Sequence, residues 1–186
     1  KNIGIIGYGK IGKELSKRLS SFDTNITAFT RKKIKKDKFL DNVYLSAEIK
    51  NYIHLFDYVV VTCSLNDSTK NLIEKSLLKL MKKTAVIVNI ARGEIINEKD
   101  LFEFLKNKKL GGAIIDTWYQ YPLKLSKNYK PSSYNFHKLD NIIMTPHISA
   151  WSKNMILRRS ELIKTNIENL FNKKKLYNQV DSSNFL

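Results

Sequence analysis

A glycine-rich segment near the start of the chain, Gly7-Tyr8-Gly9-Lys10-Ile11-Gly12, restricts the possible folds more than any other feature of the sequence. An apolar run at positions 3–6 precedes it and predicts a strand, and apolar residues at positions 11, 15 and 19 follow with the period of a helix. This order of strand, glycine-rich turn and helix is the context in which the G-x-G-x-x-G pattern binds a dinucleotide. Gly7 would permit the tight turn, Gly9 would let a pyrophosphate approach the backbone, and Gly12 would allow close helix–strand packing. The N–H groups at the start of the helix, near Lys10 and Ile11, would donate to the phosphates.

Short β-branched runs alternate with helical patterns along the rest of the chain, which predicts a parallel sheet with crossover helices. The predicted strands are 3–7, 25–29, 58–62, 85–89, 113–116 and 142–145. Later helices are expected to begin at Ser46, Ser76, Asn97 and Ser152, and residues 121–137, which contain two prolines, read as a long surface loop. We therefore expect one doubly wound α/β domain of the Rossmann type, with three α/β/α layers and six or seven strands. It would span 1–186, with residues 174–186 as a C-terminal tail.

Composition excludes several classes of protein. With 42% hydrophobic residues and 7 glycines among 186, the chain can form a real core. Its single cysteine, Cys63, excludes a disulfide framework or a cysteine-based zinc site and favours the cytoplasm. Apolar runs are too short to span a bilayer, so we expect no membrane partner. We also expect no metal site. The net charge of +16 comes mostly from scattered lysines, which indicates a solvated surface and no nucleic-acid partner.

The end of the second predicted strand bears on the choice of cofactor. An acidic residue there would accept hydrogen bonds from the adenosine ribose of NAD. This chain has Thr30-Arg31-Lys32 instead, and a guanidinium suits a 2′-phosphate. The sequence therefore favours NADP, with NAD as the alternative; Arg31 and Lys32 could also be no more than part of the basic surface.

Three polar residues follow neighbouring strands farther along the chain. Arg92 follows the strand at 85–89, Asp116 ends the next, and His147 follows the last. Ligands bind at the carboxyl ends of parallel strands in such sheets. These residues are thus candidates for carboxylate binding, nicotinamide positioning and proton transfer.

Several segments together resemble one family, the D-isomer-specific 2-hydroxyacid dehydrogenases. The resemblance covers residues 1 to about 180 and rests on four segments in the right order: 4–12, Leu65 with Thr69, 89–94 with Leu101, and 112–116 followed by 145–149. It implies that Arg92 binds the carboxylate and carbonyl of a 2-oxo acid and that His147 protonates the carbonyl oxygen. It also implies that Asp116 meets the nicotinamide carboxamide. Further cofactor contacts are expected from Cys63, Ser64, Thr69, Ile90, Ala91, His147 and Ala150.

The chain departs from the family pattern in two ways. Family members commonly have a catalytic Glu just before the Pro that follows the Asp strand, where this chain has Tyr121 before Pro122. Tyr121 can hydrogen-bond His147 but brings no negative charge. The family also has a substrate domain that lies mostly before the glycine-rich segment, and we expect it to be absent here.

The resemblance implies an NAD(P)-dependent oxidoreductase that acts on a small 2-oxo or 2-hydroxy acid, of the glyoxylate or hydroxypyruvate reductase type. We expect the fragment alone to bind nucleotide without turnover, and expect a homodimer, because relatives commonly dimerise through this domain. Two alternatives stay open: a non-catalytic dinucleotide-binding module similar to a corepressor, and an oxidation similar to that of formate dehydrogenases.

Overall fold

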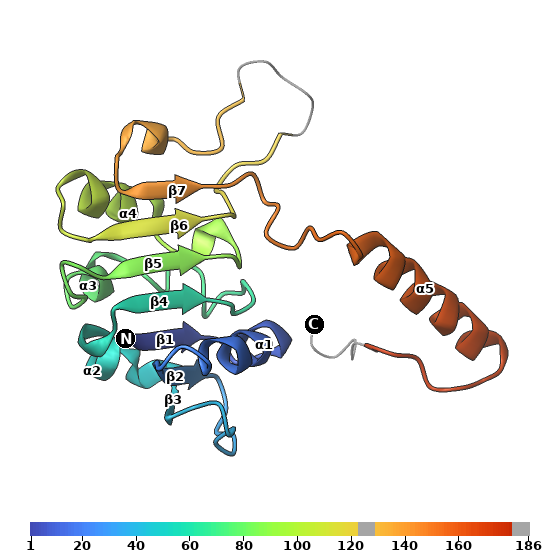
Figure 1. Cartoon of the computed structure of the whole chain (residues 1–186). Coiled ribbons are helices and arrows are strands. Elements are labelled where there is room, and N and C mark those ends of the chain that lie inside the picture. Colours follow the sequence, from blue (N-terminus) through green and yellow to red (C-terminus); the bar gives the residue numbers. More distant parts are fainter. Residues whose placement is uncertain (123–128, 180–186) are drawn as a thin grey trace. The chain divides into compact units, whose positions relative to one another are not determined.

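The chain forms a single parallel sheet with helices on both faces, as the sequence predicts. The computed structural model describes residues 1–122 and 129–179, and residues 123–128 of the predicted loop and 180–186 of the predicted tail lie outside the described residues. Within the described part, seven strands pair in the order β3-β2-β1-β4-β5-β6-β7, and all six pairings are parallel (Figure 1). The doubly wound fold is therefore confirmed.

Six of these strands coincide with the predicted ones to within one or two residues. Their bounds are β1 Asn2–Ile6, β2 Asn25–Thr30, β4 Tyr58–Val61, β5 Val86–Asn89, β6 Gly112–Ile115 and β7 Ile142–Met144. The seventh, β3 Asn42–Leu45, was not predicted from the sequence. It forms the edge of the sheet, and its residues are half-buried or exposed.

In the described residues, five α-helices connect or follow these strands. They are α1 Lys10–Leu19, α2 Ile49–Tyr52, α3 Lys75–Leu78, α4 Glu98–Lys106 and α5 Met155–Phe171. Asn97 caps α4 as predicted, since its side-chain oxygen accepts a hydrogen bond from the backbone N–H of Asp100 at 3.1 Å. The other expected starts were wrong by one to three residues: α2 follows a short turn that begins at Ser46, α3 begins before Ser76, and α5 begins after Ser152.

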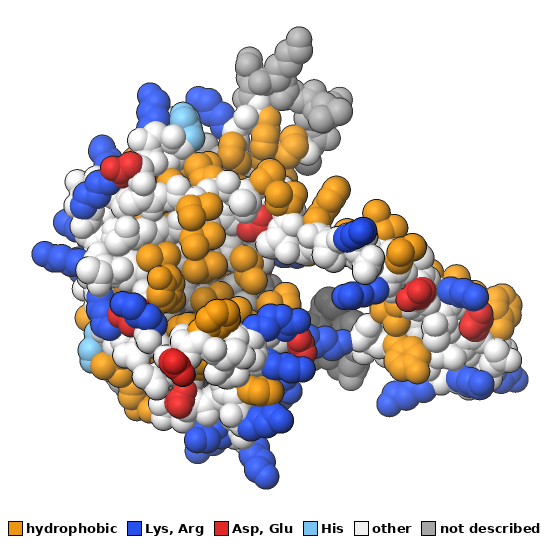
Figure 2. All heavy atoms as spheres, in the orientation of Figure 1, with side chains coloured by type: hydrophobic (Ala, Val, Ile, Leu, Met, Phe, Trp, Pro, Cys, Tyr) orange, Lys and Arg blue, Asp and Glu red, His pale blue; other side chains and the backbone are white. Residues whose placement is uncertain are grey.

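The hydrophobic core lies on both faces of the sheet. On one face, α2, α3 and α4 pack against alternate strand residues such as Val59, Ile87 and Ala113. On the other face, a smaller cluster includes Ile5, Ala28 and Val60, and the α1 side chains Leu15 and Leu19 pack against it. Figure 2 shows hydrophobic side chains gathered over the strands on the visible face, with Lys and Arg side chains spread around them.

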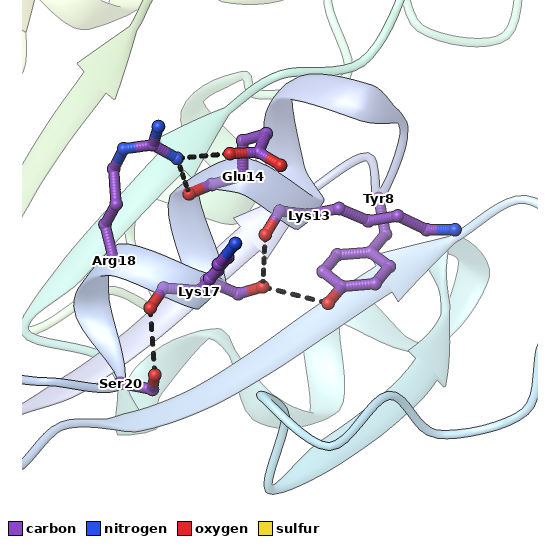
Figure 3. A network of polar contacts seen from close by, with 7 residues as sticks. Tyr8, Lys13, Glu14, Lys17, Arg18 and Ser20 are labelled. Carbon is purple, nitrogen blue, oxygen red and sulfur yellow. Dashed lines mark hydrogen bonds and ion pairs between the residues drawn. The ribbon is translucent and has the colours of Figure 1, made fainter.

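Besides Leu15 and Leu19, the helix α1 contacts the sheet through two small residues. Gly12 and Ser16 are buried, whereas Ile11, which we expected on the core face, is 56% exposed. A Cβ at Gly12 would come within 2.6 Å of the Gly7 carbonyl oxygen, so only glycine allows this close approach. The Ser16 hydroxyl bonds Tyr8 Oη at 2.9 Å and donates to the Lys13 carbonyl, while on the exposed side Arg18 pairs with Glu14 (Figure 3).

The chain divides into two compact units, Lys1–Ser149 and Ala150–Leu186. The sheet, α1 to α4 and every contact described below belong to the first unit. The second unit contains α5, whose apolar side chains at 156, 157, 163, 167, 170 and 171 are largely exposed. Among the described residues, no helix combines the length and the apolar character needed to cross a bilayer.

Candidate cofactor cleft and active site

A cleft of about 730 Å³ opens at the carboxyl ends of β1, β2, β3 and β4. Eight of the residues expected to contact a cofactor line it: Gly7, Gly9, Thr30, Arg31, Lys32, Cys63, Ser64 and Thr69. The residues that line this cleft include two cations, Arg31 and Lys32, and no carboxylate. The cleft therefore suits an anionic ligand.

The glycine-rich turn has the geometry that a bound phosphate requires. Gly7 has a φ of +94°, and a Cβ there would come within 2.6 Å of the Cys63 backbone, so a side chain is excluded on two grounds. A Cβ at Gly9 would meet no atom within 4 Å, which leaves open space beside the start of α1. The residues present thus fit the pyrophosphate of a dinucleotide, because this space adjoins the backbone N–H groups at the N-terminus of α1.

The turn after β2 presents two cations to the cleft. The buried Thr30 hydroxyl donates to the Lys32 carbonyl at 2.8 Å, which closes the turn and uses the only proton of that hydroxyl. Thr30 therefore shapes the turn, while the exposed side chains of Arg31 and Lys32 are the groups available to a ligand.

Other expected cofactor residues lie outside the large cleft. Lys10, Ile11 and Ile90 line an adjacent open hollow of about 390 Å³ together with Leu15. Gly12 and Ala91 are buried. The remaining three are Asp116 and His147, described below, and Ala150, which belongs to the second unit.

Arg92 is presented by a turn that the buried side chain of Asn89 holds closed. The Asn89 amide donates to the Arg92 carbonyl at 2.8 Å, and its oxygen accepts from the Ala91 N–H at 3.1 Å. The Arg92 side chain is exposed beyond the end of β5. A Cβ at the next residue, Gly93, would come within 2.5 Å of the Trp118 carbonyl oxygen, so this turn lies directly against the segment that follows β6.

His147 lies on a turn that the carboxylate of Asp116 holds. Asp116 Oδ1 accepts from Thr145 Oγ1 at 2.6 Å and from the Ile148 N–H at 2.9 Å, and Oδ2 accepts from the Ser149 N–H at 3.0 Å. His147 itself has a φ of +59°, a left-handed conformation that is uncommon for a residue with a side chain. Asp116, 2% exposed, therefore fixes the turn on both sides of His147.

Tyr121 contacts the imidazole directly. Its hydroxyl oxygen lies 2.9 Å from His147 Nδ1, so the hydrogen bond expected from the sequence is present. The same oxygen accepts from the Trp118 backbone N–H at 3.1 Å, and the Trp118 indole N–H donates to the Thr145 carbonyl at 2.9 Å. Sequence reasoning missed Trp118 and Asn89 as supports of the site, because both act through backbone contacts that no sequence pattern marks.

Two titratable groups in this region have shifted pKa values. Burial raises the pKa of the Asp116 carboxyl, but the hydrogen bonds from Ser149, Thr145 and Ile148 outweigh burial and hold that pKa at about 2. Burial raises the pKa of the Cys63 thiol to about 11. Asp116 is thus an anion at neutral pH, and Cys63 is a neutral thiol in the wall of the cleft. No group of three or more His, Cys, Asp or Glu side chains within residues 1–122 and 129–179 could hold a metal ion.

Comparison with known proteins places the chain in a family. The model of the D-isomer specific 2-hydroxyacid dehydrogenase NAD binding domain matches residues 1–149. Among curated proteins, the chain is 35% identical over 170 residues to a glyoxylate reductase of Pyrococcus horikoshii, which covers 90% of this chain and 47% of that protein. The chain thus spans about half the length of the curated relatives it matches.

Solved structures give the same result for the fold. A D-lactate dehydrogenase with NAD⁺ from Lactobacillus jensenii has a TM-score of 0.83 at 25% identity, covering 97% of this chain and 56% of that one. An NADPH-dependent glyoxylate/hydroxypyruvate reductase from Sinorhizobium meliloti, in complex with NADP and sulfate, has a TM-score of 0.83 at 22% identity, covering 98% and 56%.

Proposed function

Because the chain belongs to the D-isomer specific 2-hydroxyacid dehydrogenase family, whose NAD-binding domain it contains, we propose that it is the cofactor domain of a reductase of small 2-oxo acids. The observation that carries the proposal is the convergence of Arg92, Asp116 and His147 at the carboxyl ends of the neighbouring strands β5, β6 and β7. A glyoxylate or hydroxypyruvate type of substrate is supported by the relatives named glyoxylate reductase.

A nicotinamide dinucleotide bound in the cleft would supply the hydride. The exposed Arg92 guanidinium binds the carboxylate of the oxo acid, for which its planar fork is suited. His147 donates a proton to the carbonyl oxygen, because a ring held by Tyr121 through Nδ1 keeps Nε2 for the substrate. Asp116 keeps the His147 turn in place and can meet the nicotinamide carboxamide only with lone pairs that the turn leaves unused.

For the cofactor we propose a preference for NADP. Arg31 and Lys32 are the charged residues that line the cleft, and a 2′-phosphate would pair with them. The chain should bind NADPH more tightly than NADH in a fluorescence titration, and Arg31→Ala should narrow the difference by about 1–3 kcal/mol. Lys33→Ala, a neighbouring exposed cation that does not line the cleft, is the matched control. Equal affinities for the two nucleotides in the unmodified chain would contradict the preference.

Turnover is tested in a protein that carries this chain together with a substrate domain. His147→Ala should lower kcat for glyoxylate reduction by roughly 10²–10⁴-fold, the usual contribution of a general acid. Arg92→Lys should raise KM, because an ammonium cannot replace a bidentate guanidinium. Full activity of both variants would refute the assignment, and nucleotide binding without any turnover would favour a dinucleotide-sensing module.

A homodimer and a cytoplasmic location are part of the proposal. The dimer is supported only by the resemblance, because family members commonly dimerise through this domain. A monomer mass in light scattering on the purified chain would contradict the dimer. The location is supported by the single cysteine, Cys63, in a chain without a disulfide framework.

A further inference from the structure

We propose that Tyr121 is a positioning residue that selects the tautomer of His147. Its hydroxyl donates to Nδ1, so the proton of the neutral imidazole stays on Nε2. The role of that proton toward a substrate rests on the proposed function, but the tautomer itself does not. A tyrosine at this position therefore reverses the proton arrangement that a carboxylate would impose.

The side chains of Tyr121 and His147 are within hydrogen-bonding distance. Tyr121 Oη lies 2.9 Å from His147 Nδ1, which is a full hydrogen bond, and the ring centroids are 5.5 Å apart. Only one proton can lie between the two atoms. Either the phenol donates to a bare Nδ1, or a protonated Nδ1 donates to the phenol oxygen.

The backbone N–H of Trp118 favours donation by the phenol over donation by Nδ1. This N–H can only donate, so Tyr121 Oη is already an acceptor at 3.1 Å. Trp118 and His147 are the only hydrogen-bond partners of the Tyr121 hydroxyl within residues 1–122 and 129–179. If Nδ1 also donated, the oxygen would accept two N–H groups and its own proton would have no protein acceptor among them. If the phenol donates to Nδ1, the Trp118 N–H, the phenol proton and the Nδ1 lone pair each have one partner.

Hydrogen bonds hold the contact between Tyr121 and His147 in place. Both side chains are exposed, and Tyr121 is 48% exposed, so a free pair would reorient in water. The backbone on both sides of His147 is held, because Asp116 accepts from the Ile148 and Ser149 N–H groups while the Trp118 indole donates to the Thr145 carbonyl. The Tyr121 hydroxyl is held in turn by the Trp118 backbone N–H.

The proton arrangement has a chemical consequence. A carboxylate at position 121 could only accept, which would keep the proton on Nδ1 and leave a lone pair on Nε2. Tyr121 leaves an N–H on Nε2, which is the group that the carbonyl oxygen of a 2-oxo acid accepts from. The neutral site therefore presents an N–H that can hydrogen-bond the carbonyl oxygen of a 2-oxo acid. A 2-hydroxy acid would instead need the other tautomer, in which the unprotonated Nε2 can take up the proton of the hydroxyl group. When the ring takes up a second proton, the phenol can still turn and accept from Nδ1–H.

The test is NMR on the 186-residue chain with ¹⁵N-labelled histidine, using long-range ¹H–¹⁵N correlations at the high-pH plateau of the ring shifts. The chain has three histidines, so His147→Gln identifies the signals of His147, and those of His54 and His137 report whether each variant is folded. The variants are Tyr121→Phe and Tyr121→Glu. Tyr129→Phe is the matched control, because it removes a hydroxyl that bonds the Gln120 carbonyl in the same region.

We expect Nε2 to carry the proton in the unmodified chain and Nδ1 to have the shift of a hydrogen-bonded, unprotonated nitrogen. In Tyr121→Phe the Nδ1 signal should move to the position of a nitrogen without a donor, and in Tyr121→Glu the proton should move to Nδ1. Tyr129→Phe should change neither signal. A proton on Nδ1 in the unmodified chain, or an Nδ1 shift that Tyr121→Phe leaves unchanged, would overturn the proposal. Neither NMR result depends on turnover, so the tautomer proposal can fail or stand separately from the proposed reductase function.

Discussion

The carboxylate of Asp116 is the point at which the active-site turn can be perturbed most selectively. Asp116→Asn keeps the shape of the side chain. It places an NH₂ group where a carboxylate oxygen now accepts a hydrogen bond from a backbone N–H, either that of Ile148 or that of Ser149. The folded-state pKa of about 2 lies nearly two units below the ordinary value of 3.8. At 1.36 kcal/mol per unit, this difference corresponds to about 2 kcal/mol of stabilisation at neutral pH.

The sign of the pH dependence follows from the lowered pKa. A carboxyl whose pKa is depressed by folding stabilises the protein fully above its unfolded value of 3.8, and this contribution is lost as the pH falls from about 4 to about 2. At pH 7, Asp116→Asn should therefore cost about 2 kcal/mol, which is about 4–8 °C in melting temperature for a chain of this size. The difference between the two proteins should shrink steadily below pH 4.

The assay combines thermal melting of the chain, from pH 7 down to pH 3, with amide hydrogen exchange. Exchange is needed because the turn can open locally, in which case the Ile148 and Ser149 amides lose protection while the melting temperature changes little. Asp67→Asn, which removes an exposed carboxylate elsewhere on the same unit, is the control. If Asp116→Asn changed neither the melting curve nor the protection of these two amides, the reasoning would be refuted.

Three further substitutions or treatments test the local structure. Asn97→Ala should lower the free energy of unfolding by about 1 kcal/mol through loss of the α4 cap, whereas Asn97→Asp should leave denaturant melting nearly unchanged. Gly93→Ala should cost about 1–3 kcal/mol in the same assay, because its Cβ would come within 2.5 Å of the Trp118 carbonyl oxygen; an equal stability would mean that the turn yields freely. Cys63, with its pKa raised to about 11, should react with iodoacetamide at pH 8 about 100-fold more slowly than a cysteine of the ordinary pKa of 9.0, and reaction at the ordinary rate would show an open thiol.

Much of the fold could be predicted because the central strands are buried. Residues 59–61 and 86–88 are continuous apolar runs, and the glycine-rich segment predicts the first strand–helix unit. The edge strand β3 was not predicted, since its apolar run, Val43-Tyr44-Leu45, has only three residues, and so short a run does not by itself distinguish a strand from a helix. In α1, Leu15 and Leu19 pack against the core as predicted, but Ile11 does not, because the close approach that Gly12 permits adds Gly12 and Ser16 to the contact with the sheet.

The candidate site, like the fold, could be predicted only in part from the sequence. Residue type and position after a strand were enough to select Arg92, Asp116 and His147, because parallel strands bring their carboxyl ends together. The sequence could not show that the Thr30 hydroxyl donates to a carbonyl of its own turn. It also could not show that Asp116 accepts three hydrogen bonds from the His147 turn. Those facts depend on backbone N–H and carbonyl groups, which every residue has and which only the folded chain places.

The segment from Asp116 to Tyr121 emerges as the common support of both proposed substrate groups. It holds the His147 turn through the Asp116 carboxylate, the Trp118 indole and the Tyr121 hydroxyl, and its Trp118 carbonyl lies against Gly93, next to Arg92. Because one short piece of backbone positions both turns, a shift at the end of β6 would move the proposed carboxylate anchor and the proposed proton donor together. This explains how a neutral phenol can take the place of a carboxylate without loss of order at the site: the carboxylate of Asp116 already fixes the turn, so the residue at position 121 has only to set the proton on the ring.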